Sequence, residues 1–168
     1  MLFLTLRVLH VLLAAAWLGS TMFMSLMLMP VIDASGPAGG QIMIGLNKKG
    51  ISAYFGAIGG ITVLTGIYLF WHFTGGFEPA VSRTNAGMAY GVGGAAGLLA
   101  VIIGGSVVGR GANRIVELLS QLPKLPDAQK GPVLEQAGAL KARVRTFGLV
   151  VIVLQVIALG LMAIAHYV

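Results

Sequence analysis

The apolar positions of this 168-residue chain form four long continuous runs rather than an alternating pattern. The runs cover residues 2–29, 51–73, 86–109 and 147–168. A helix needs about 20 apolar residues to cross the hydrocarbon core of a bilayer, and each run reaches that length. Continuous runs favour helices, because the strands of a membrane barrel alternate apolar and polar side chains. The pattern therefore predicts an all-α integral membrane protein, a four-helix bundle with residues 1–168 as one transmembrane domain.

The segments between the runs differ in character. Residues 30–50 and 74–85 are rich in glycine and proline, and we expect them to be loops. Residues 110–145 are different, because their apolar positions recur at helical spacing and proline interrupts the pattern near the middle. Pro132 fits the first turn of a second helix that continues into the last run. We therefore expect a cytoplasmic helical hairpin, which either lies along the lipid headgroups or docks a partner.

The composition excludes a soluble domain, since 57% of the residues are hydrophobic, only 10% are charged, and the mean hydropathy is +0.92. We expect the first run to be a retained helix rather than a cleaved signal peptide. Arg7 lies inside it, no basic segment precedes it, and it is too long for a signal peptide core. The absence of cysteine excludes disulfides, thiolate metal sites and cysteine-held iron–sulfur clusters.

Basic residues predict the orientation of the bundle. Only Arg7 and Arg83 lie on the side that carries both chain ends. The other nine of the eleven Lys and Arg residues lie on the opposite side, and these are Lys48, Lys49, Arg110, Arg114, Lys124, Lys130, Lys141, Arg143 and Arg145. The distribution predicts that both termini are outside, in a multi-pass protein of the bacterial inner (plasma) membrane. The net charge of +6 reflects this topology and attraction to anionic lipids, and we do not expect nucleic-acid binding.

The only three histidines are His10, His72 and His166, and this topology places all of them near the outer face. At about 1.5 Å per residue, His72 and His166 lie roughly 15 Å outward of their helix midpoints, and His10 about 9 Å. Two imidazoles on facing helices can hold a haem iron axially, and His10 and His72 are the favoured pair, with His166 in reserve. Arg7, one turn from His10, and Arg83 are candidate partners of the haem propionates.

Helical spacing places polar side chains on the faces that carry two of these histidines. His72 shares a face with Tyr68, Thr65, Ile61 and Tyr54. His166 shares one with Met162, Leu159 and Gln155. Polar groups in hydrocarbon are costly unless they point into the bundle, so both faces are expected to point inward.

Interfacial anchoring is the alternative interpretation for two of the histidines. His72 follows Trp71, and His166 precedes Tyr167, which fits the aromatic belt at a membrane surface. His10 lies deeper, where anchoring explains it less well. It is therefore the first candidate ligand.

Glycine concentrates in the second and third runs. Spacings of four residues join Gly56 to Gly60, Gly87 to Gly91, Gly93 to Gly97, and Gly105 to Gly109. Small residues at this spacing let helices approach closely, so we expect tight packing of the second helix on the third, or a homodimer seam. The alternative is that glycine clears space for a flat porphyrin. Gly94 and Gly97 are expected at a close helix crossing, and Ala100 outside it.

Four methionines, Met22, Met24, Met27 and Met29, cluster at the end of the first run. Thioethers suit Cu(I), although methionine is also an ordinary packing residue. No Ser–His–Asp set, carboxylate pair, phosphate-binding loop or dinucleotide motif is present, so no catalytic residue is assigned and enzymatic activity is left open.

The residues LRVLHVLLAAAWLG at 6–19 resemble the opening helix of the copper-resistance protein D-like membrane families. They are also similar to the opening of the membrane-bound protoporphyrinogen oxidase family, in which a histidine is followed by tryptophan and glycine. TGIYL at 65–69 is similar to the end of their second helix, and LMAIAHY at 161–167 resembles the last helix of related bacterial membrane proteins. The oxidase resemblance implies a b-type haem held by His10 and by a lysine of the third helix. The third run has no lysine, so the second ligand departs from that family.

The leading hypothesis is a b-type haem-binding membrane protein that serves electron transfer or haem handling. The competing hypothesis is a non-catalytic accessory subunit of a larger respiratory or photosynthetic membrane complex, docked through the glycine-rich helices and the basic hairpin. Copper handling through His10 and the methionine cluster is a third, weaker hypothesis.

Overall fold

The computed structural model describes residues 1–168 and contains helices but no strand. The elements are α1 (Leu2–Met22), η1 (Phe23–Leu28), α2 (Met29–Ala34), α3 (Pro37–Lys48), α4 (Ile51–Phe73), α5 (Pro79–Ser82), α6 (Asn85–Ile103), η2 (Gly104–Gly109), α7 (Arg110–Gln121), η3 (Leu122–Lys124) and α8 (Asp127–Ile164). The predicted all-α fold is confirmed.

Four helices are long and apolar enough to cross a membrane, as the apolar runs predicted. They cover Leu2–Ala34, Ile51–Phe73, Asn85–Lys124 and Asp127–Ile164. The first joins α1 to α2 through the π-helical segment η1, and the third joins α6 to α7 through the π-helical segment η2. The last is the single 38-residue helix α8.

The expectation of a loop over residues 30–50 was wrong, because helices occupy most of this segment. Pro37 stands in the first turn of α3, where proline fits because no backbone N–H is needed there, whereas Pro30 follows η1 inside one continuous helical span. The side chain of Met43 in α3 is buried. Pro132 was also misplaced, because α8 begins earlier and the proline lies inside it.

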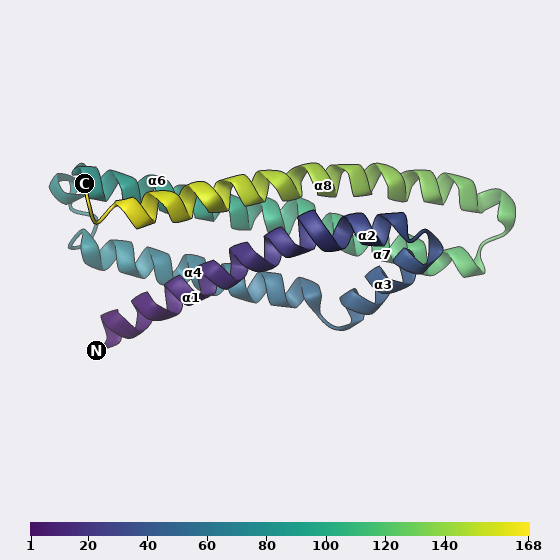
Figure 1. The fold of residues 1–168 in the computed structure, drawn as a ribbon, viewed down its shortest axis with the longest axis horizontal. Helices are drawn as coiled ribbons and strands as arrows, with labels where there is room; N and C mark the ends of the chain where they lie inside the picture. The colour runs from purple at the N-terminus through teal and green to yellow at the C-terminus, as the bar shows by residue number, and fades with distance from the viewer.

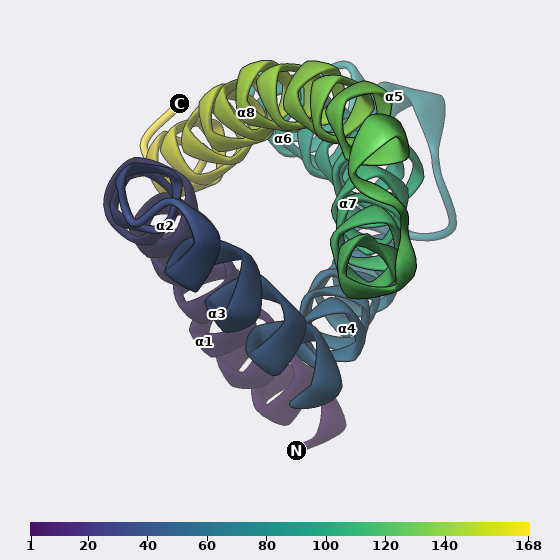
Figure 2. The same cartoon turned by 90° about the vertical axis from the view of Figure 1, so that its right-hand side faces the viewer.

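The four spans form a closed ring in which α1 contacts α4, α4 contacts α6, α6 contacts α8, and α8 contacts α1. The end-on view in Figure 2 shows this order around the bundle. Both chain ends lie at the same end of the bundle, together with the end of α4 and the start of α6 (Figure 1). We call this the terminal end. The opposite end contains α3, α7, η3 and the start of α8. These elements and Lys49, which follows α3, carry the nine clustered basic residues, and we call this the basic end.

Each span contributes one residue to the buried centre of the bundle, namely Trp17, Ile58, Ala100 and Val151. Helix α4 approaches this centre through Gly59, where a Cβ would lie 3.2 Å from the ring of Trp17. A second buried cluster, Ile32, Met43 and Ile115, joins α2, α3 and α7 at the basic end. The first of these clusters contains residues of α1 and α4, the two helices between which the site described below lies.

The predicted positions of the glycine contacts were wrong in part. A Cβ at Gly94 or Gly97 would meet no atom within 4 Å, whereas Ala100 is 0% exposed and lies at the centre of the bundle. Helix α6 packs more extensively on α8 than on α4, and Gly93 faces α8, where a Cβ would lie 3.2 Å from the carbonyl oxygen of Ala158. Spacing alone identified helices rich in small residues but not the face that each helix turns to its neighbour.

Candidate functional site: the His10 imidazole between α1 and α4

His10 reaches from α1 to the backbone of α4. Its Nδ1 atom lies 2.9 Å from the carbonyl oxygen of Thr62 and 3.1 Å from the hydroxyl oxygen of Thr65. A carbonyl oxygen can only accept a hydrogen bond, so Nδ1 carries the proton. The Thr65 hydroxyl is positioned to donate to the carbonyl oxygens of Ile61, at 2.8 Å, and Thr62, at 2.9 Å, in its own helix. Its oxygen is therefore left to accept from Nδ1 of His10. The neutral ring therefore has its lone pair on Nε2.

Gly66 provides the space that the His10 ring occupies against α4. A Cβ at this position would lie 2.9 Å from Cε1 of His10 and 3.7 Å from its Nε2 atom. No larger residue fits there without moving the imidazole or separating α1 from α4. Gly66 stands one helical turn after Thr62, so the same short stretch of α4 supplies both the acceptor and the space.

The sequence pattern predicted this face of α4 only in part. Thr65 is buried as expected, but Ile61 and Tyr54 of the same predicted face are exposed. The buried face runs instead through Ile58, Gly59, Thr62 and Thr65. The sequence interpretation missed Thr62 and Gly66, because nothing in the local sequence shows which turn of α4 lies opposite His10.

We call the contact between α1 and α4 the α1–α4 seam. His72 lies on this seam, as His10 does, but nearer to the terminal end. Its ring centroid is 4.6 Å from that of Phe3 and 6.3 Å from that of Tyr68, and the side chain is exposed. At a rise of 1.5 Å per residue, His72 stands roughly 9 Å along α4 from Gly66, which faces His10. Axial ligands of one haem iron lie on opposite sides of the ring plane, whereas these imidazoles follow one another along one seam.

The third histidine lies apart from this seam. His166 follows the end of α8, is exposed, and has its ring centroid 5.6 Å from that of Tyr167. No group of three or more His, Cys, Asp or Glu side chains is close enough to hold a metal ion. The geometry thus brings His10 and His72 to the same helix pair and does not add His166 to them.

Arg7 and Arg83, the candidate propionate partners, are both exposed. Arg7 lines a shallow groove on α1 with Leu4, Val8, Val11 and Leu12, and His10 does not line that groove. Arg83 follows the short helix α5 at the terminal end. Neither guanidinium forms an ion pair with a carboxylate, so both are free to bind an anionic group.

The methionines of the first span lie in different environments. Met22 and Met27 are exposed, whereas Met29 packs against the buried cluster of Ile32, Met43 and Ile115. The thioethers are thus spread between the surface of the bundle and the interior of its basic end.

Gln155 of α8 is a second polar group inside the bundle, as predicted, whereas Leu159 and His166 of the same predicted face are exposed. It is 5% exposed, and its Nε2 atom donates to the hydroxyl oxygen of Thr21 at 3.3 Å. The Thr21 hydroxyl donates its own proton to the carbonyl oxygen of Trp17 at 2.8 Å, which fixes the direction of the Gln155 bond. The Oε1 atom of Gln155 is buried and has no hydrogen-bond partner.

Comparison of the chain with known protein families, with curated proteins and with solved structures found no match.

Proposed function

We propose that this protein is a b-type haem-binding integral membrane protein that serves electron transfer or haem handling, with His10 as an axial ligand. The observation that carries the proposal is the bond from Nδ1 of His10 to the carbonyl oxygen of Thr62. Imidazoles that bind metals through Nε2 characteristically donate the other N–H to a carbonyl or carboxylate, which fixes the tautomer and strengthens the donor. His10 meets this condition within the membrane-spanning part of the chain.

The surrounding residues orient the imidazole that would hold a haem. Thr62 and Thr65 hold the plane of the imidazole, and Gly66 leaves room for the ring. Arg7 stands one turn nearer to the terminal end than His10, where its guanidinium can bind a propionate. Haem, when bound, supplies one-electron redox chemistry, and the protein supplies the ligand and its orientation. The similarity of residues 6–19 to the opening of the membrane-bound protoporphyrinogen oxidase family, which implies a haem held by His10, supports the same assignment.

We further propose that the terminal end faces the outside of a bacterial inner membrane and the basic end faces the cytoplasm. Nine of the eleven Lys and Arg residues lie at the basic end, and the positive-inside rule orients such a bundle. In this orientation, His10 and His72 lie in the part of the α1–α4 seam that is nearer to the outer side.

Reduced-minus-oxidised visible spectra of the protein purified from haem-supplemented cells test the haem proposal. Sharp α and β bands are expected for the natural sequence, and the Soret band should be lost in His10→Ala because no neighbouring apolar side chain can replace the iron–imidazole bond. Met24→Ala is the control and should retain the full Soret band. His72→Ala and His166→Ala then assign the second ligand. A natural protein without haem bands, or full haem occupancy in His10→Ala, would contradict the assignment.

A further inference from the structure

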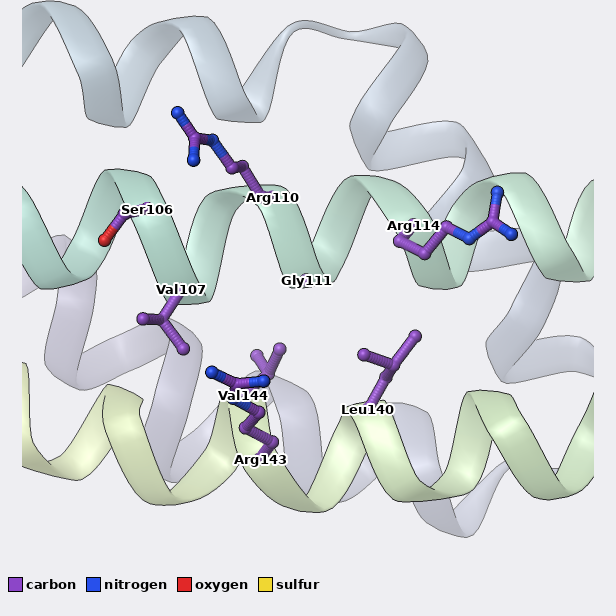
Figure 3. Close-up of a pocket in the computed structure, with 8 residues that line it drawn as sticks. All are labelled: Ser106, Val107, Arg110, Gly111, Arg114, Leu140, Arg143 and Val144. Carbon is purple, nitrogen blue, oxygen red and sulfur yellow. The ribbon is translucent and has the colours of Figure 1, made fainter.

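A groove of about 210 Å³ opens between α7 and α8 at the basic end, far from His10. Three arginines line it, Arg110 and Arg114 from α7 and Arg143 from α8, together with Ser106 and the apolar side chains of Val107 and Val144 (Figure 3). Helix α7 approaches α8 closely at Gly111, where a Cβ would lie 2.6 Å from Cγ2 of Val144. The floor of the groove is therefore a tight helix contact, and its basic groups surround that contact.

The positive charge of this groove is only partly neutralised. Arg114 forms an ion pair with Glu117 at 2.6 Å. Neither Arg110 nor Arg143 has a carboxylate partner, and Arg143 instead lies over the ring of Phe147, with its Cζ atom 5.9 Å from the centroid. Figure 3 shows the Arg143 guanidinium between the two helices, whereas the Arg110 side chain extends from α7 on the side away from α8. An uncompensated guanidinium beside an apolar wall favours an anionic ligand that also has an apolar part.

The groove lies at the level where both helices change from apolar to charged. Residues 85–109 contain no Lys, Arg, Asp or Glu, and Arg110 follows them directly. Residues 146–168 also contain none, and Arg143 and Arg145 precede them. Contact between Gly111 and Val144 places these two boundaries side by side. In a bilayer, this is the level of the phosphate groups of the lipids, with the acyl chains beside the apolar residues.

We propose that the α7–α8 groove is a binding site for the headgroup of an anionic phospholipid. The lipid phosphate binds the guanidinium group of Arg143, Arg110 adds positive charge from α7, and one acyl chain runs along the apolar surface that begins at Val107. Guanidinium binds phosphate through two parallel hydrogen bonds. A zwitterionic headgroup binds less well, because the arginines repel its ammonium group. The site is independent of haem, so its failure would leave the function proposed above untouched.

Native mass spectrometry of the delipidated full chain, titrated with phosphatidylglycerol and with phosphatidylcholine, tests the site. We expect tighter binding of phosphatidylglycerol. The double variant Arg110→Gln/Arg143→Gln should weaken it roughly tenfold or more, since each basic side chain near the headgroups contributes substantially to anionic lipid binding. Arg83→Gln/Arg145→Gln removes the same charge outside the groove and should weaken it clearly less, because neither arginine lines the groove. Equal losses in the two double variants would overturn the proposal.

A second variant separates the shape of the groove from its charge. Val107→Phe leaves every arginine in place but fills the groove, and it should also weaken phosphatidylglycerol binding. Free glycerol phosphate distinguishes a lipid from a soluble phosphate ligand, because it lacks the acyl chains and should not displace the lipid at equal concentration. Unchanged lipid binding in Val107→Phe, or equally tight binding of glycerol phosphate, would overturn the lipid site.

Discussion

Gly66 of α4 faces the imidazole of His10 on α1 so closely that a Cβ at this glycine would lie 2.9 Å from Cε1 of the ring. The same imidazole donates to the carbonyl oxygen of Thr62. The hydrogen bond therefore depends on the glycine, because the ring reaches Thr62 only while position 66 has no side chain.

Gly66→Ala should displace the His10 ring and break its bond to Thr62. We expect a loss of about 1 kcal/mol in stability, the usual contribution of one hydrogen bond, together with weakened haem binding. Gly60→Ala on the same helix is the matched control, since a Cβ there would meet no atom within 4 Å. Thermal midpoints in detergent and Soret absorbance measure the two effects. Equal behaviour of the two variants would show that the ring does not lie against Gly66.

Ala100→Leu should destabilise the bundle far more than Gly97→Leu. Ala100 is fully buried at the centre, where the added atoms must displace neighbouring side chains, at a cost of typically 1–3 kcal/mol. A Cβ at Gly97 would have no neighbour within 4 Å, so leucine there is expected to extend toward open space. Thermal unfolding monitored by circular dichroism compares the two variants. A lower midpoint for Gly97→Leu than for Ala100→Leu would place the helix crossing at the glycine.

The orientation can be tested with reporter fusions. A reporter fused after Val168 should be active outside, and one inserted near Gln129 should be active in the cytoplasm, because the basic residues gather at the end that contains Gln129. Alkaline phosphatase and green fluorescent protein give opposite signals at the two positions. Reversed signals would invert the bundle and move the three histidines to the cytoplasmic side.

The four spans were predictable from the sequence because length and continuous hydropathy are properties of each segment alone. The helices α2 and α3 were not, since their glycines and prolines are equally typical of turns, and only burial of Ile32 and Met43 at the basic end shows that the segment packs. The site follows the same division. His10 was identified by its depth in the first span, whereas Thr62 and Gly66 depend on the register of α1 against α4, which packing across the whole bundle determines.

The pair formed by Gln155 and Thr21 gives opposite expectations for its two single variants. Gln155→Leu removes a buried amide whose Oε1 atom has no partner, and the Thr21 hydroxyl keeps its bond to Trp17. This variant should be neutral or stabilising by up to about 1 kcal/mol, since no polar group loses its partner. Thr21→Val has nearly the same shape as the natural residue but leaves the Gln155 amide without its only acceptor, which should cost about 1–3 kcal/mol.

Thermal midpoints of both single variants and of the double variant measure the coupling. In the double variant the loss from Thr21→Val should largely disappear, because the stranded amide is gone. An unchanged loss there would mean that the cost arises from the Thr21 site itself.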